Sequence, residues 1–146
     1  MTEIQNNLFY TASILEYTAR RTKNKRAVIA SLIGTGGVRS ILECAEVNHC
    51  LPFSQVADEL IQDYRIPSGR FAPEDHVTKV PSSSEIGKVY MRLVEDAQPD
   101  QEKYPEELVA IFTSKIADWM TEYQSAFFYS PRDYILECYR EIQQNG

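Results

Sequence analysis

The sequence predicts an all-α protein, with six to seven helices in a compact bundle. Three observations lead to this class. Apolar residues recur with the 3.6-residue period of an α-helix in several separate stretches of the chain. Residues that favour helix starts stand immediately before some of these stretches. With 146 residues, 43% of them hydrophobic, the chain is also long enough to bury a core without a disulfide or a metal.

The first expected helix covers residues 4–21. Its apolar residues lie on two faces, which predicts a central position with packing on both sides. Asn24 is a candidate N-cap for a second helix over 25–33. Residues 34–37 include three glycines, whose tolerance of positive φ predicts a sharp reversal before a third helix over 38–47.

A fourth helix is expected over residues 53–64, because Pro52 suits a helix start and one face is apolar. That face consists of Phe53, Val56, Ala57, Leu60, Ile61 and Tyr64. Residues 65–81 then break the pattern with three prolines and a glycine. We expect a loop there, with a brief extended piece over 76–80.

The second half of the chain predicts three more helices. Ser82 and Glu85 have the spacing of a capping box, which starts a helix expected to end near residue 97. A proline opens a longer helix over 105–123, whose apolar stripe continues for more than four turns. Ser130 is the expected N-cap of the last helix.

The loop over 65–81 suggests two helical lobes, over 1–64 and 82–146, with a single domain over 1–146 as the open alternative. The second lobe holds the whole net charge of −6, because residues 1–80 carry nine Lys/Arg and nine Asp/Glu while residues 81–146 carry six and twelve. A surface of this sign repels phosphate backbones, and it suits either a basic protein partner or solubility alone.

Five cations are concentrated in one turn near the end of the first helix: Arg20, Arg21, Lys23, Lys25 and Arg26. They could bind phosphates or an acidic partner. They could also offset the negative end of the helix dipole, or neutralise acidic groups of the same molecule. The intramolecular roles are favoured, since nucleic-acid-binding surfaces more often carry a basic stripe over a whole face.

The candidate partner-binding surface combines carboxylates from the acidic stretch 95–107 with aromatic rings that follow it in the sequence. Tyrosine and tryptophan are favoured as interface anchors. Packing between helices is the alternative role for the rings, and a solvated face is the alternative for the carboxylates. The predicted contact residues are Glu102, Glu106, Glu107, Trp119, Tyr123, Phe127, Phe128 and Tyr129.

We find no catalytic, metal-binding or cofactor-binding pattern. Cys44, His49 and Cys50 lack the paired spacing of a zinc site. Adjacent side chains rarely point toward each other, so a nucleophilic Cys50 with His49 as its base is not expected. The glycines of 34–37 lack the lysine of a P-loop. Three cysteines, no signal peptide and no apolar run near ~18–20 residues predict a cytoplasmic protein with mostly buried thiols.

Residues 8–64 resemble a family of short, uncharacterised bacterial helical proteins. The resemblance follows Phe9-Tyr10, Ile14-Leu15-Glu16-Tyr17, Val28-Ile29, Leu32-Ile33-Gly34, Val38, Ile41-Leu42-Glu43, His49-Cys50 and Val56-Ala57-Asp58-Glu59-Leu60-Ile61. Members of that family resemble small partner proteins encoded beside ADP-ribosyltransferase-like toxins in firmicute genomes and mobile elements. The resemblance implies an antitoxin or accessory role, carries over no functional residues and does not cover the second half.

The leading hypothesis is a non-enzymatic protein of the antitoxin, immunity or mobile-element inhibitor class. It would bind another bacterial protein, expected to be basic, through an acidic and tyrosine-rich helical surface. No cofactor, membrane or nucleic acid is expected as a partner, and the oligomeric state is left open. The first alternative is a nucleic-acid-associated regulator that uses the basic turn over 20–26. The second is an enzyme that uses His49, Cys50 or His76.

Overall fold

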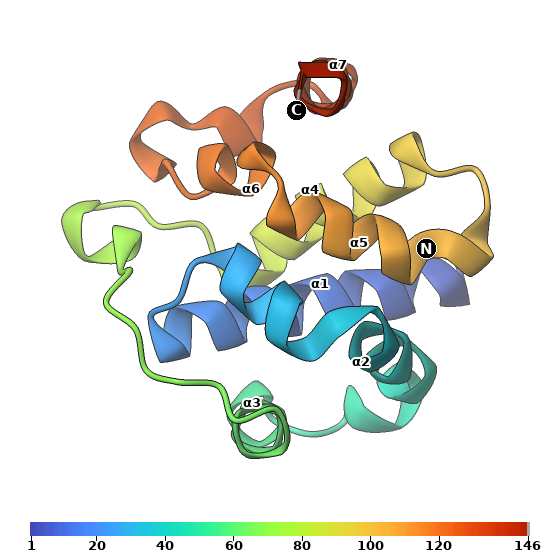
Figure 1. Cartoon of the computed structure of the whole chain (residues 1–146), viewed down its shortest axis with the longest axis vertical. Helices are drawn as coiled ribbons and strands as arrows, with labels where there is room; N and C mark the ends of the chain where they lie inside the picture. Colours follow the sequence, from blue (N-terminus) through green and yellow to red (C-terminus); the bar gives the residue numbers. More distant parts are fainter. Residues whose placement is uncertain (146) are drawn as a thin grey trace.

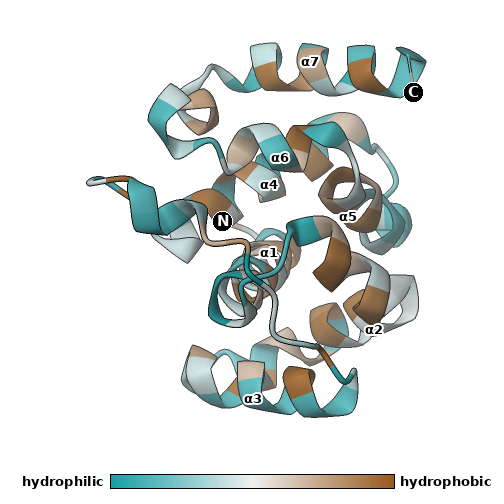
Figure 2. Ribbon diagram, turned by 60° about the vertical axis from the view of Figure 1, so that its left-hand side comes forward, coloured by the Kyte–Doolittle hydropathy of each residue, from teal (hydrophilic) through white to brown (hydrophobic). Residues whose placement is uncertain are grey.

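The computed structural model describes residues 1–145 and contains no strand among them. Seven helices pack compactly, which confirms the all-α prediction (Figure 1). They are α1 (Glu3–Thr22), α2 (Arg26–Asn48), α3 (Phe53–Asp63), α4 (Ser83–Ala97), α5 (Tyr104–Thr113), α6 (Lys115–Met120) and α7 (Arg132–Asn145). Short 3-10 turns lie between them: η1 (Pro73–His76), η2 (Gln101–Lys103), η3 (Tyr123–Ser125) and η4 (Phe127–Tyr129). Figures 1 and 2 both place α3 and α7 at opposite ends of the molecule, with α1 between them.

Helix α1 occupies the centre of the bundle, as its two apolar faces predict. It packs against α4, α2 and α3. Leu8, Leu15 and Ala19 on one face and Ile14 on the other are fully buried. Apolar side chains on both sides of the same helix leave it little contact with water, which favours this central position.

One hydrophobic core extends across the loop that was expected to separate two lobes. The pairs α1–α4 and α2–α5 each join a helix from before this loop to a helix from after it. Leu15 and Ile33 belong to the same buried cluster as Tyr90 and Phe112, whose ring centroids lie 4.5 Å apart. This packing favours the single-domain alternative.

The loop between α3 and α4 is held against the turn between α1 and α2. Three hydrogen bonds hold it: Gly69 N to Thr22 O (2.8 Å), Phe71 N to Lys23 O (2.8 Å) and Asn24 Nδ2 to Pro67 O (2.7 Å). Asn24 is therefore buried under the loop and does not cap α2, which corrects the predicted N-cap. Of the extended piece expected over 76–80, His76 belongs to the helical turn η1, and Val77 after it has an extended backbone without forming a strand.

Two helical segments meet at a kink at Gly34, close to the break predicted between helices over 25–33 and 38–47. Helix α2 comprises both segments, and Gly34 between them leaves helical geometry, with φ 71° and ψ 172°. The bend keeps Ile29, Ile33, Val38 and Ile41 in the core. The glycines were read correctly as a site of positive φ, and the single non-helical residue Gly34 joins the two segments in place of the longer turn that was expected over 34–37.

Replacing Gly34 by alanine should lower the free energy of unfolding by about 1–2 kcal/mol, because a side chain at this φ and ψ is strained. A urea titration followed by circular dichroism measures the change. Gly36→Ala is the matched control, since its Cβ would meet no atom within 4 Å and its φ is not positive. We expect the control to gain about 0.5–1 kcal/mol. Equal effects at both glycines would contradict this account of the kink.

The helix expected over 105–123 is divided in two at Ser114. This residue has an extended backbone, with φ −90° and ψ 169°. Its hydroxyl accepts from Ile116 N at 3.2 Å and donates to Ile111 O at 2.8 Å. Ser114 thus caps the start of α6, and the chain turns there without exposing Ile116 or Phe112. The apolar period continues through the break, so periodicity alone did not reveal it.

Two expectations about the N-terminal half need correction. Helix α2 is, by length and composition, long and apolar enough to cross a membrane. Those criteria do not separate a spanning helix from a core helix, and α2 packs along α1 and α5. The cysteines were expected to be mostly buried, but Cys44 and Cys50 are exposed and only Cys138 is buried.

Candidate functional site

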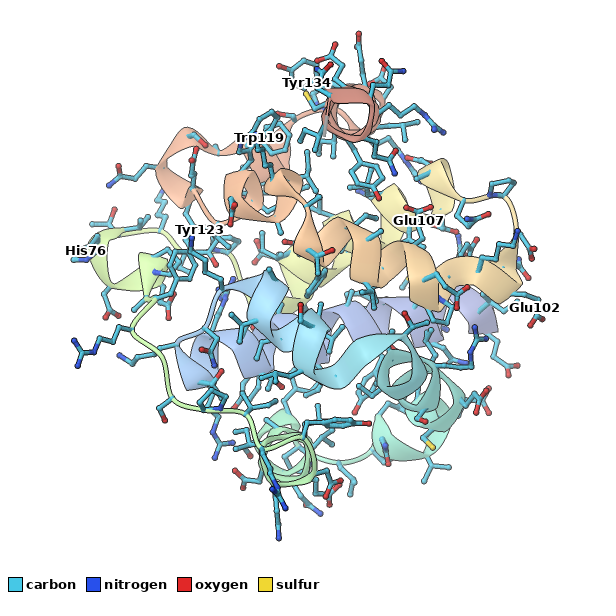
Figure 3. The ribbon with its side chains drawn as sticks, in the orientation of Figure 1. His76, Glu102, Glu107, Trp119, Tyr123 and Tyr134 are labelled. Atoms are coloured by element: carbon cyan, nitrogen blue, oxygen red, sulfur yellow. The ribbon has the colours of Figure 1, made fainter. Side chains whose placement is uncertain are left out.

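The most exposed aromatic surface lies where α6, η4 and α7 meet. Trp119 and Phe127 have ring centroids 5.5 Å apart with planes at 83°, and Phe127 and Tyr134 follow at 6.3 Å and 60°. We call these three residues the aromatic row. Trp119 is 36% exposed and Tyr134 is 52% exposed. Figure 3 shows Trp119 and Tyr134 on the same side of the molecule, between α6 and α7.

Local turns bring these rings together from three elements. Ala126, between η3 and η4, has the left-handed conformation with φ 55°, which reverses the chain after α6. Arg132 at the start of α7 then donates two hydrogen bonds to Asp96 on α4, at 2.9 and 2.8 Å. These contacts hold the first turn of α7, and with it Tyr134, beside the η4 ring of Phe127.

Exposed carboxylates lie on the elements that carry the aromatic row. Asp118 and Glu122 are exposed near Trp119, and Glu137 and Glu141 are exposed on α7. The pKa of Tyr134 is raised, mainly by the neighbouring Cys138 and in part by Glu141 and Glu137.

Two of the predicted contact residues are core residues. Tyr123 is 4% exposed and Phe128 is 7% exposed, so their assignment to a binding surface is corrected. Tyr123 points inward and its hydroxyl donates to Glu16 at 3.1 Å. Tyr129 is by contrast 75% exposed and packs against Phe128, with ring centroids 4.5 Å apart. Tyr134 was not among the predicted contacts, although its place three residues after Pro131, in the first turn of a helix, could have indicated exposure.

The predicted acidic contacts lie away from the aromatic row and engage other parts of the chain. Figure 3 shows Glu102 on the opposite side of the view from Trp119. Arg39 donates to the Glu102 carbonyl at 3.4 Å and to Glu106 Oε1 at 2.5 Å. Glu107 accepts from the buried Tyr139 hydroxyl at 2.7 Å. The carboxylates of Glu106 and Glu107 therefore hold α5 against α2 and α7, whereas Glu102 contributes its backbone carbonyl.

The basic turn is largely neutralised within the molecule. Arg26 is 2% exposed and donates to both oxygens of Glu16, at 2.9 and 2.6 Å, while Arg20 donates to the same carboxylate at 2.8 Å. Arg21 pairs with Asp58, and Lys23 lies 3.9 Å from Asp75. Lys25 lies over the ring of Phe71 at 5.8 Å. Most of the positive charge seen in the sequence is thus already paired.

Glu16 is the centre of a buried polar network that the sequence did not indicate. Its burial alone would raise its pKa, but the charges and hydrogen bonds of Arg26 and Arg20 outweigh burial and lower the pKa to about 2. Burial and the nearby Glu16 both raise the pKa of Tyr123, although Arg26 and Arg20 oppose this. Glu16 therefore stays ionised in the core at any neutral pH, and Tyr123 keeps its proton as a hydrogen-bond donor.

The three residues of the enzyme alternative are exposed, and two of them lie together. Cys50 Sγ lies 3.8 Å from His49 Nε2, so the expectation that these adjacent side chains would not meet is wrong. The sharp turn after α2 brings them together. His76 lies on η1, and its carbonyl accepts from Gln124 at 3.3 Å. Within residues 1–145, no three His, Cys, Asp or Glu side chains are arranged to hold a metal ion.

Comparison of the chain with known protein families, curated proteins and solved structures finds no match. The resemblance of residues 8–64 to partners of ADP-ribosyltransferase-like toxins therefore stays a prediction.

Proposed function

We propose that this chain is a non-enzymatic interaction protein that binds a basic segment of another bacterial protein on the aromatic row and the adjacent Tyr129. Its class would be antitoxin, immunity protein or mobile-element inhibitor, as the resemblance of the first half implies. The observation that carries the proposal is the exposure of Trp119 and Tyr134 in one row of rings. Rigid aromatic side chains that stay exposed in a folded protein are favoured anchors for a partner.

The charge around the rings supports a basic partner. Glu137 and Glu141 are exposed on α7, which also carries Tyr134, and Asp118 and Glu122 are exposed next in sequence to or shortly after Trp119. A lysine or arginine of the partner could lie over the Trp119 or Tyr134 ring and pair with one of these carboxylates. Complementary charge of this kind mainly increases the association rate and the selectivity for the partner.

The nucleic-acid alternative has less support. Arg26 is buried, and Arg20, Arg21 and Lys23 each pair with a carboxylate of this chain. Breaking those pairs to bind phosphates would cost the free energy of four internal interactions. In addition, Arg39 is the one Lys or Arg in the segment of α2 after Gly34, and it pairs with Glu106 of this chain.

Removing the rings should greatly weaken partner binding. The tagged protein is first used to isolate its partner from the native host, with a charge-matched unrelated protein as the control bait. The affinity of the purified pair is then measured by calorimetry for the wild type and for Trp119→Ala with Tyr134→Ala. We expect a loss of about 30-fold or more, the usual effect of truncating an anchor at an interface.

Charge-reversal variants test whether partner binding uses the carboxylates of this surface or the acidic residues elsewhere in the chain. Glu137→Lys should slow association, and the difference should shrink as salt rises, because the effect is electrostatic. Glu102→Lys changes the net charge equally but lies away from the row, so its association rate should match the wild type. Equal slowing by both variants, or unchanged affinity without the rings, would count against the proposed surface.

A further inference from the structure

The chain between α6 and α7 carries the middle ring of the aromatic row. We call residues 121–131 the connecting segment, and it consists mainly of the short turns η3 and η4. Ala126 joins these turns in the left-handed conformation, with φ 55°. Phe127, directly after it, stands between Trp119 and Tyr134 in the row. The position of this ring therefore depends on what holds the connecting segment against the rest of the fold.

Two buried rings anchor the connecting segment in the core. Tyr123 precedes Ala126 and Phe128 follows it, and they are 4% and 7% exposed. Their ring centroids lie 6.3 Å apart, with the planes at 80°. Thr121 is also buried, but its hydroxyl donates to Asp118 O at 2.9 Å and so adds only a local hydrogen bond. Tyr123 and Phe128 thus fix the two turns from either side of Ala126.

Tyr123 also makes polar contacts with α1 and α2. Its hydroxyl donates to Glu16 Oε2 at 3.1 Å and accepts from Arg26 Nη2 at 3.2 Å. The Arg20 guanidinium lies over its ring, 5.3 Å from the centroid. Figure 3 shows Tyr123 between the connecting segment and the α1–α2 turn, and Trp119 on the side toward α7. Hydrogen bonds to charged groups are stronger than neutral ones, so this one side chain ties the connecting segment firmly to the core.

We propose that Tyr123 positions the aromatic row. Its hydroxyl binds the buried pair of Glu16 and Arg26, which fixes the connecting segment. The fixed segment in turn holds Phe127 edge to face with Trp119. This inference rests on the proposed function, because it explains how the row is kept ordered for a partner. A surface that is ordered before binding loses less conformational entropy when the partner binds, so Tyr123 contributes to affinity without touching the partner.

Trp119 is the only tryptophan of the chain, so its fluorescence reports on the row directly. Tyr123→Phe keeps the buried ring and removes the hydroxyl. Glu16 keeps its pairs with Arg20 and Arg26, so the variant should fold. At a temperature well below its unfolding midpoint, we expect acrylamide to quench Trp119 more strongly than in the wild type, and the fluorescence anisotropy to be lower. A loss of stability alone would leave the quenching of the folded chain unchanged.

Tyr10→Phe is the matched control, because it removes a buried tyrosine hydroxyl that bonds no other group within the described residues. Its quenching should equal that of the wild type. Unchanged quenching in Tyr123→Phe, or an equal rise in both variants, would overturn the positioning role of Tyr123.

Binding of the purified partner separates this inference from the proposed function. We expect Tyr123→Phe to bind about two- to tenfold more weakly, the effect of one side chain that must be ordered on binding. If Trp119→Ala with Tyr134→Ala keeps full affinity, the proposed surface is wrong, and the fluorescence result still decides whether Tyr123 positions the row. If those rings are needed and Tyr123→Phe binds with unchanged affinity, Tyr123 does not keep the row ordered for the partner and the inference is wrong.

Discussion

Glu16→Gln should lower the free energy of unfolding by about 3–5 kcal/mol, measured by urea titration at neutral pH. The substitution keeps the shape of the side chain but removes the charge that Arg26 and Arg20 share. Arg26 is 2% exposed, so its guanidinium would remain in the core without a counter-charge. A loss of this size is a large fraction of the ~5–15 kcal/mol that stabilises a typical domain.

Two further variants test whether the unpaired charge of Arg26 causes the loss of stability in Glu16→Gln. Asp58→Asn breaks the exposed pair with Arg21, and we expect it to cost at most about 1 kcal/mol. Glu16→Leu combined with Arg26→Met removes both buried charges and should recover much of the stability, since burying an apolar pair avoids the cost of removing charges from water. If the double variant were less stable than Glu16→Gln, the unpaired charge of Arg26 could not be the main cause.

The same network predicts a direction for the dependence of stability on pH. The pKa of Glu16 is about 2 in the folded chain and 4.5 as its ordinary value. A lowered folded pKa stabilises the fold fully above the ordinary value, and this contribution is lost as the pH falls toward about 2. The stability difference between wild type and Glu16→Gln should therefore shrink between these two pH values. A difference that stays constant across this range would contradict the assigned pKa.

The helical periods were the most reliable information in the sequence. Val56, Ala57 and Leu60 were placed on the inner face of one helix, and Ile86, Tyr90 and Val94 on that of another, and all six are buried. Their burial follows from amphipathic spacing alone, which is a local property. The same reasoning could not detect the break at Ser114, because the apolar stripe continues on both sides of it.

The candidate site depended on contacts that no local pattern encodes. Tyr123 and Phe128 stand close to Trp119 in the sequence, yet the first two turn inward and Trp119 stays partly exposed. Tyr123 is held inside by Glu16, which lies 107 residues earlier in the chain. Likewise, an intramolecular role was favoured for the basic turn, but the sequence did not identify Glu16 as the partner of Arg20 and Arg26. Contacts between residues so far apart in the sequence can be identified only from the tertiary structure.

Gly87→Ala should destabilise the fold by about 2–3 kcal/mol, toward the upper end of the range for overpacking a core. Gly87 lies where α4 crosses α1, and a Cβ there would come within 2.9 Å of the backbone N and Cα of Ser13. Backbone atoms in the middle of a central helix cannot move aside as a flexible side chain can. The added methyl group would therefore push α4 away from α1 and open the contact between the two halves of the chain. Chemical unfolding of the purified variant measures the loss.

The sign of the change in unfolding free energy shows whether α4 packs closely on α1. In a helix, alanine is preferred over glycine by about 1 kcal/mol, so Gly87→Ala would be stabilising if α4 did not pack closely on α1. Gly36→Ala, which meets no neighbouring atom, supplies that reference value in the same protein. Opposite signs at these two glycines, with a single cooperative transition in both variants, would show that the halves before and after the 65–81 loop unfold as one unit. A stabilising effect at Gly87, or two separate transitions, would instead mean that the α1–α4 contact is loose and that the halves are independent lobes.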